Sequence, residues 1–491
     1  MFRLSYLPPL MVYAAYGVSG LTGIVGTFFV KDYLDLSAEF LAALAFWAGI
    51  PWAMKMPVGH VVDLIWRRKA LLVWLGAAMI AASLLIMVGL LSHLEAMSAW
   101  MSAGRWFVLS ALLAPTGYMI QDAVADAMTV EAVPRLDEQG LPYDPQTRKS
   151  MHTTMQTLGR VAIIGGLTLV AAVNIWIFYD AAALPPGRKA ALYADVYAAA
   201  LVIPLISVSG VVLHRFLRHP VEHAERTAPN WSVLGGSLAF VALTLVVGLG
   251  ELPYAQELIF SGSLAVIVFL LWRLARELEP ASREVLVATA AILFIYRAMP
   301  GTGAGSTWWM IDVLKFDEEF LSRLSLVAYA LTLAGMFAFR RFMAENSIAA
   351  IIVVLSIAGG VLALPNIGMF YGMHEWTAAR TGGVVDARLI ALIDTALESP
   401  LGQIAMIPLL AWIANSAPAN LKATYFAVMA SFSNLALAAS QLGTKYLNQA
   451  YVVTRGGYGE LGELMIAAVL IGVALPLAAV AVVRMTSLRT A

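Results

Sequence analysis

Apolar stretches of about twenty residues recur along almost the whole chain of 491 residues. An α-helix rises about 1.5 Å per residue, so a stretch of about 20 residues can cross the apolar core of a bilayer. Hydrophobic residues make up 60% of the sequence and charged residues only 13%, about half of the charged fraction of an average soluble domain. We therefore expect an all-α, polytopic membrane protein.

About fourteen spans are predicted, in the order six, two and six. The first six end before a polar stretch at 219–230. The next two are short and are joined by a tight connection at 251–254, as in a hairpin. The expected spans are residues 8–30, 40–62, 69–92, 105–131, 153–178, 194–217, 232–250, 255–274, 284–310, 320–342, 347–369, 388–414, 421–447 and 462–485.

The distribution of lysine and arginine predicts the orientation of these spans. Positively charged short loops tend to remain in the cytoplasm, and most of the basic residues follow an even number of spans. Both termini are therefore expected in the cytoplasm, in a bacterial-type inner (plasma) membrane. The predicted domains are an N-terminal six-helix bundle (1–218), a cytoplasmic linker with the inserted hairpin (219–283) and a C-terminal six-helix bundle (284–491).

The sequence lacks the patterns of several other classes of protein. It has 31 basic and 31 acidic residues with no long run of either, so composition gives no support for a nucleic-acid partner. It contains no cysteine, which excludes disulfides and thiolate metal sites. No nucleophile elbow, metal-ligand spacing or phosphate-binding glycine loop occurs. We expect neither an enzyme nor a bound metal or cofactor.

The end of the second predicted span has a characteristic spacing. Gly59, Asp63, Arg67, Arg68 and Lys69 resemble the G-x-x-x-D-x-x-x-R-R-K signature of the major facilitator superfamily, whose two six-helix halves also resemble the predicted layout. Glycine allows close helix approach, and the aspartate can contact an arginine or a helix N-terminus. We expect these residues to form a cytoplasmic gate. The alternative is a positively charged loop with an incidental carboxylate.

Segments in both halves resemble the folate-biopterin transporter family. The segments are residues 29–37 (FVKDYLDLS), 50–59 (IPWAMKMPVG), 121–131 (QDAVADAMTVE), 312–321, 406–410 and 423–434. The chain departs from the family pattern at Lys422, where the family has an acidic residue, at the split dipeptide Lys55-Met56-Pro57, and in the added hairpin. The resemblance implies a membrane transporter for a folate, a pterin or a similar aromatic anion.

Ionisable side chains at membrane depth are costly to bury, so each one is a candidate for function. Arg297 precedes a breaker-rich stretch at 299–305, which should unwind its helix. Its guanidinium could hold a carboxylate or phosphate through two hydrogen bonds. We expect Arg297, Glu398, Lys55 and Trp308 to bind the solute. The alternatives are a structural salt bridge for Lys55 and simple packing for Trp308.

Two carboxylates of the fourth span are candidates for proton coupling. Asp122 and Asp126 are four residues apart and therefore share a helix face. A carboxylate that is flanked by another and partly desolvated holds a proton more readily. We expect Asp122, Asp126 and Glu131 to be proton-coupling residues, with Glu131 at the inner mouth. The alternative is that Lys55 and Arg160 neutralise these carboxylates and hold the bundle together.

The superfamily resemblance also implies where these charges lie. Helices one, four, seven and ten of that superfamily line a central cavity, which would put Asp122, Asp126, Arg297 and Glu398 on the solute path. Glycine recurs in the first span at positions 17, 20, 23 and 26. This spacing permits close helix approach and gate movement, although packing alone explains it equally well.

These features together predict a secondary active transporter. We expect a proton-coupled symporter that moves a small polar or anionic solute by alternating access. Its expected partners are the solute, protons or another coupling ion, and the lipid bilayer, and we expect a monomer. Two alternatives stay open: an exporter of amphipathic compounds, and a non-transporting membrane assembly factor or sensor that uses the hairpin as a docking surface.

Overall fold

The computed structural model of the chain is helical throughout its described part. α-Helices and short 3-10 turns account for the regular elements, and the described residues contain no β-strand. The prediction of an all-α membrane protein is confirmed. The structure describes residues 3–34, 36–53, 55–134, 140–217, 244, 246–247, 254–276, 278–402, 404 and 422–486.

Many of the predicted spans are present as long helical segments. Within the described residues, nine helices are long and apolar enough to cross a membrane. They are Leu4–Tyr33, Ala70–Ser92, Ala103–Ala132, Thr154–Ile177, Pro186–Phe216, Ala255–Trp272, Glu318–Ala338, Ile348–Phe370 and Leu461–Met485.

Other predicted spans are only partly described. The span at 40–62 is described as α3 (Ala38–Ala53) and α4 (Lys55–Leu64), with residue 54 between them outside the described part. The first helix of the hairpin, 232–250, lies outside the described residues except at 244, 246 and 247, whereas its second helix is α12 (Ala255–Ala275). The span at 388–414 begins as α20 (Ala387–Glu398), and most of its remainder is outside the described part.

The chain forms two compact units. One contains Met1–Leu34, Pro57–Gly236 and Leu321–Tyr329, and the other contains Asp35–Met56, Ser237–Phe320 and Ala330–Ala491. Helix α3 therefore groups with the second unit and part of α15 (Glu318–Ala338) with the first. The division into domains at 1–218, 219–283 and 284–491 stays a prediction.

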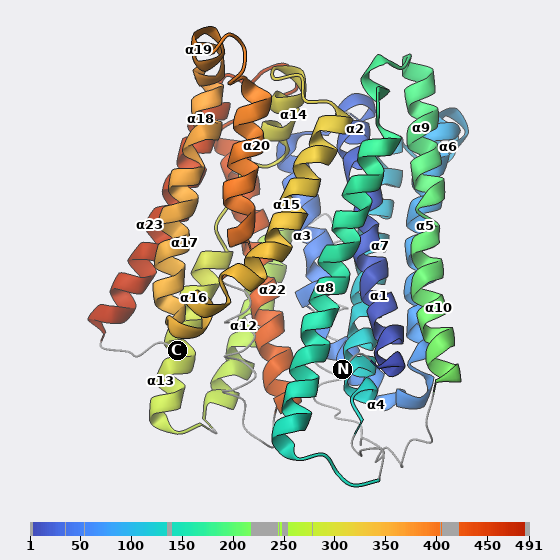
Figure 1. Cartoon of the computed structure of the whole chain (residues 1–491), viewed down its shortest axis with the longest axis vertical. Helices are drawn as coiled ribbons and strands as arrows, with labels where there is room; N and C mark the ends of the chain where they lie inside the picture. The colour runs from blue at the N-terminus through green and yellow to red at the C-terminus, as the bar shows by residue number, and fades with distance from the viewer. Residues whose placement is uncertain are drawn as a thin grey trace. The chain divides into compact units, whose positions relative to one another are not determined.

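The first unit is a bundle in which α1, α7, α8 and α10 run side by side (Figure 1). Close contacts depend on glycine: a Cβ at Gly17 would lie 2.2 Å from the carbonyl oxygen of Ile163, and a Cβ at Gly76 would lie 2.6 Å from that of Gly117. The absence of a side chain thus lets α1 approach α8, and α5 approach α7. The elements are η1 (Leu4–Tyr6), α1 (Leu7–Val18), η2 (Ser19–Thr22), α2 (Gly23–Tyr33), α4, η3 (Trp66–Arg68), α5 (Ala70–Ser92), α6 (Leu94–Trp100), α7 (Ala103–Ala132), α8 (Pro145–Ile177), η4 (Ala181–Ala183), α9 (Pro186–Ala199) and α10 (Val202–Phe216).

The second unit has an apolar core made by residues of α3, α12, α13, α17, α22 and α23. Helix α3 packs along α22, where Asn434 Nδ2 donates to the carbonyl oxygen of Trp52 at 3.0 Å. Helix α3 is also bonded to α12, because Gln256 Nε2 of α12 donates to the carbonyl oxygen of Ala43 at 2.9 Å. The remaining elements are α13 (Pro280–Arg297), α14 (Ala304–Asp312), α15, α16 (Arg340–Glu345), α17 (Ile348–Leu362), α18 (Leu364–Phe370), α19 (Met373–Arg380), α20, η5 (Ser399–Leu401), α22 (Lys422–Ala450) and α23 (Leu461–Met485).

The predicted break after Arg297 is present between α13 and α14. The unwound backbone at 298–303 ends at Gly303, whose φ of 73° is readily adopted by glycine. Side chains spaced one turn apart on α22 bond the backbone groups that the break leaves unpaired. The contacts are Ser440 Oγ to Met299 O (2.6 Å), Gly301 N to Thr444 Oγ1 (2.9 Å) and Asn448 Nδ2 to Thr302 O (3.3 Å).

Candidate functional site

A short hydrogen bond joins Tyr13 of α1 to Asp126 of α7. The phenol Oη donates to Asp126 Oδ1 at 2.5 Å, and Tyr13 is only 6% exposed. Gly159 of α8 makes room for the ring, because a Cβ at this position would lie 3.0 Å from Tyr13 Cε2. Tyr13 therefore fixes the orientation of one predicted coupling carboxylate within the bundle.

Two further charges lie near this pair. The charges of Asp122, Asp126 and Arg160 all act on the Tyr13 hydroxyl, and those of Asp122 and Arg160 also act on Tyr16. Tyr13, Tyr16, Asp122, Asp126 and Arg160 form what we call the Tyr13 cluster. The structure thus brings the two predicted carboxylates together with Arg160. Sequence reasoning missed both tyrosines, although a phenol hydroxyl inside an apolar span is itself a signal.

Arg160 presents a charge near the middle of α8. Its side chain is exposed, as are Gln156 and Thr157, which lie one turn earlier on the same side of the helix. Gln156 Nε2 also donates to Thr129 Oγ1 of α7 at 3.5 Å. Polar side chains at membrane depth are costly against lipid and typically face a water-filled cavity. This face of α8 can therefore offer a guanidinium to an anion.

Glu131, the third predicted coupling residue, lies in a different cluster. Glu131 Oε1 is 2.6 Å from Lys69 Nζ, and Glu131 Oε2 is 3.0 Å from His214 Nε2. Lys69 is only 2% exposed, and its ammonium lies 4.2 Å from the centre of the Trp66 ring. A buried ammonium needs such partners because desolvation penalises an unpaired charge. Glu131 thus pairs with a predicted gate residue, a contact that sequence reasoning missed.

The other predicted gate residues occupy α4 and η3. Arg67 and Arg68 are exposed in η3. The side chain of Asp63 lies outside the described part of the chain. Among the described atoms, none lies within 4 Å of a Cβ built on Gly59.

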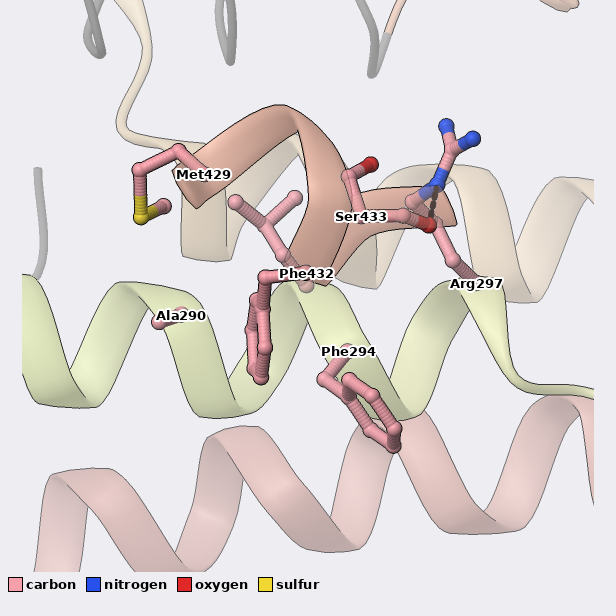
Figure 2. A pocket seen from close by; sticks show the side chains of 7 residues that line it. Ala290, Phe294, Arg297, Met429, Phe432 and Ser433 are labelled. Atoms are coloured by element: carbon pink, nitrogen blue, oxygen red, sulfur yellow. Dashed lines mark hydrogen bonds between the residues drawn. The ribbon is translucent and has the colours of Figure 1, made fainter. Parts of the chain in front are cut away.

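Arg297, a predicted solute-binding residue, borders a small pocket between α13 and α22. Its Nε donates to the carbonyl oxygen of Ser433 at 3.3 Å, and Figure 2 shows the guanidinium directed away from Phe294 and Phe432. The space open to water is about 10 Å³, room for about one water molecule. This pocket is too small for a bicyclic ring in the present conformation. It is lined by Ala290, Leu293, Phe294, Arg297, Met429, Phe432 and Ser433.

Glu398 is exposed at the C-terminal end of α20, and a second carboxylate lies one turn before it. Asp394 is 5% exposed, and its Oδ2 accepts a hydrogen bond from Asn366 Nδ2 at 2.6 Å. Sequence reasoning missed Asp394. The signal was available, because an acidic residue inside a predicted span is costly to bury.

The remaining predicted solute-binding residues are Lys55 and Trp308. Lys55 is half-buried in α4. Trp308 of α14 is 2% exposed, and the guanidinium of Arg455 lies 5.2 Å from the centre of its ring. Arg455 also donates to the carbonyl oxygen of Leu36 at 3.2 Å. In this conformation a cation of the protein itself therefore lies over the Trp308 ring.

Comparison with known families identifies the family of the chain. A family model described as the BT1 family matches residues 234–488, just over half of the chain. The chain belongs to the BT1 family. A relative of this BT1-family protein, the folate-biopterin transporter of Synechocystis sp., is 25% identical over 433 residues, which cover 87% of this chain and 71% of the relative. The resemblance to the folate-biopterin transporter family is thereby confirmed.

Solved transporter structures share the fold of this BT1-family protein. A mutant of the peptide transporter POT, in complex with alafosfalin, aligns with a TM-score of 0.65 at 14% identity, covering 98% of this chain and 94% of the other. A mutant of the nucleoside transporter NupG aligns with a TM-score of 0.57 at 11% identity, covering 98% and 99%. At such low identity these structures support the fold alone. The BT1-family protein is a multi-pass membrane transporter and not an enzyme.

Proposed function

We propose that this BT1-family protein is a proton-coupled symporter of a small anionic solute of the folate or pterin class. It would operate by alternating access as a member of the major facilitator superfamily. The observation that carries the proposal is the Tyr13 cluster, in which helices α1, α7 and α8 contribute two carboxylates, two phenols and an exposed arginine. The Synechocystis relative, a folate-biopterin transporter, supports the choice of solute.

The Tyr13 cluster suggests how a proton and an anion travel together. Asp122 and Asp126 neutralise Arg160 when they are ionised. Protonation of either carboxylate weakens this attraction, so the guanidinium becomes able to bind a solute carboxylate through two hydrogen bonds. Loss of the proton restores the attraction between the carboxylate and Arg160, which favours release of the solute. An anion and a proton would therefore move in the same direction.

Several other roles belong to the same proposal. Arg297, Glu398, Lys55 and Trp308 are proposed to contact the solute in a conformation that opens the second unit. Glu131 is proposed to act through its bond to Lys69 at the cytoplasmic gate, together with Arg67 and Arg68, in place of a direct part in coupling. Monomeric state, cytoplasmic termini and an inner-membrane location also remain proposals.

Transport by the purified protein in liposomes tests the proposal. We expect tritiated folic acid to accumulate when the outside is made acidic, and accumulation to collapse when a protonophore removes the pH gradient. Arg160→Ala should abolish this uptake, whereas Arg105→Ala, which removes an exposed arginine at the start of α7, should leave it intact. Uptake no greater than in protein-free liposomes, or uptake indifferent to the protonophore, contradicts the proposal. Net transport of folic acid only from the cytoplasmic side to the opposite side would favour an exporter instead.

A further inference from the structure

We propose that Asp394 carries the coupling proton in the second unit and that Glu398 delivers it from water. This inference rests on the proposed proton coupling and adds two carboxylates of α20 to it. It arises from a feature that solute binding does not explain: an acidic side chain is almost fully buried in a span, and one of its two oxygens forms no hydrogen bond with any described residue.

The geometry of Asp394 is asymmetric. Asn366 of α18 donates to Oδ2 at 2.6 Å. Oδ1 is inaccessible to solvent, and no described residue forms a hydrogen bond with it. A carboxylic acid has one hydroxyl and one carbonyl oxygen, so this arrangement suits the protonated group better than a carboxylate with two acceptor oxygens.

Among the described residues, no cation forms an ion pair with Asp394, and Arg388 of α20 pairs with Asp317 at 2.9 Å. The helices packed against α20 include α17 and α18, which contain no charged residue, and α19, which contributes His374, Glu375 and Arg380. Arg380 stacks over the Trp376 ring, 4.0 Å from its centre. The sequence from 399 to 421 also contains no charged residue. A buried charge without a partner is strongly disfavoured, so the buried state favours neutral Asp394.

Glu398 offers a path between Asp394 and water. It lies one turn further along α20, its side chain is exposed, and its charge acts on Asp394. Two carboxylates four residues apart repel each other when both are ionised, so the pair favours one shared proton. A proton that Glu398 takes from water passes to Asp394, which becomes neutral as Glu398 regains its negative charge.

Asn366 can form a hydrogen bond with both the ionised and the protonated form of Asp394. Its amide has a donor and an acceptor, so it can donate to the ionised carboxylate or accept from the carboxylic acid after a rotation of the amide. A change of protonation therefore does not leave the aspartate without a partner. This places Asp394 among residues that can change charge without disruption of the helix packing.

Chemical labelling of the full-length protein tests the buried proton without any solute. Dicyclohexylcarbodiimide reacts with protonated carboxyl groups in apolar surroundings. We expect mass spectrometry to find the label on Asp394 at neutral pH, to find less of it as the pH is raised, and to find none on the exposed Glu375. An unlabelled Asp394 across the whole range from acidic to alkaline pH would overturn the inference, whatever the solute is.

Transport of folic acid by Asp394→Asn tests the coupling role. We expect this variant to lose accumulation driven by the pH gradient but to retain exchange of external for internal folic acid, which needs no net proton movement. Asp394→Glu should restore accumulation, and Glu375→Gln should behave as the wild type. Gel filtration of each variant confirms its folding, and Asp394→Glu tests the role independently if the asparagine variant does not fold.

The outcomes separate this inference from the proposed function. If uptake by the wild type is driven by the pH gradient and Asp394→Asn accumulates folic acid equally well, the role of Asp394 is overturned. Proton coupling itself then stands. Wild-type uptake that ignores the pH gradient, or follows a sodium gradient instead, overturns the proposed coupling together with the role of Asp394, while the label on Asp394 shows that the protonation itself is real.

Discussion

The ammonium of Lys69 lies 2.6 Å from Oε1 of Glu131, although 62 positions separate the two residues in the chain. This contact joins the connection between α4 and α5 to the end of α7, and His214 brings in α10. Three segments at one end of the first unit are therefore held by a single carboxylate.

Replacement of Glu131 by glutamine should destabilise the protein strongly. It removes the negative charge that lies 2.6 Å from the buried Lys69 ammonium, for which we expect a loss of about 3 kcal/mol in the free energy of unfolding. Thermal unfolding in detergent measures the effect. Arg341→Ala is the matched control, because the pair between Arg341 and Glu345 is 87% and 59% exposed and contributes little. Equal unfolding temperatures for Glu131→Gln and the wild type would contradict the prediction.

Alanine at Gly17 should disrupt the packing of α1 against α8. Its Cβ would overlap the carbonyl oxygen of Ile163, which belongs to the backbone and cannot rotate away. We expect a loss of about 2 kcal/mol or more, typical of overpacking, visible as a lower unfolding temperature. Gly23→Ala is the control from the same glycine series, since no described atom lies within 4 Å of its Cβ. The prediction fails if the two variants unfold alike.

Loss of the Tyr13 hydroxyl should change the pH dependence of transport. Tyr13→Phe keeps the buried ring but removes the hydrogen bond to Asp126, worth about 1.5 to 3 kcal/mol when the acceptor is ionised. Folic acid uptake measured across a pH series should therefore shift its midpoint in this variant. Asp126→Asn should remove the dependence altogether. Tyr179→Phe, at a 68% exposed site, should match the wild type, and an unchanged midpoint in Tyr13→Phe would argue against the cluster as the coupling site.

The connection between α22 and α23 gives a prediction for alkaline pH. Burial and a hydrogen bond to Asp312 raise the pKa of Tyr458 to about 12, compared with about 10 in an unfolded chain. The stabilisation by this phenol is therefore complete below about pH 10 and is lost as the pH rises through about 12. The difference in unfolding temperature between the wild type and Tyr458→Phe should narrow over this window. A constant difference would show that the bond to Asp312 does not depend on the tyrosine proton.

Features encoded within one helix could be predicted from the sequence. The four-residue spacing of Asp122 and Asp126 fixed their common face, and Pro300 with Gly301 indicated the break that separates α13 from α14. Gly17 was expected to allow close approach, and it does, whereas no described atom lies within 4 Å of a Cβ built on Gly23 of the same series.

Features that depend on distant segments could not be predicted in this way. The partners of Asp126 and Glu131 lie 113 and 62 positions away, and helical periodicity contains no information about which faces meet. The grouping of α3 with the second unit is of the same kind, since it depends on contacts with α22. Asp394 is different: the rule that selected Glu398 applied equally to it, and only the exposure of the two side chains distinguishes them.

The unwound backbone between α13 and α14 is bonded by a serine, a threonine and an asparagine of α22. These peptide groups therefore have protein partners inside the bilayer, and a change in their geometry requires the partners on α22 to move too. Three hydrogen bonds therefore couple the break between α13 and α14 to α22. Any rotation of α22 during a transport cycle should consequently move the break and α14 together with it.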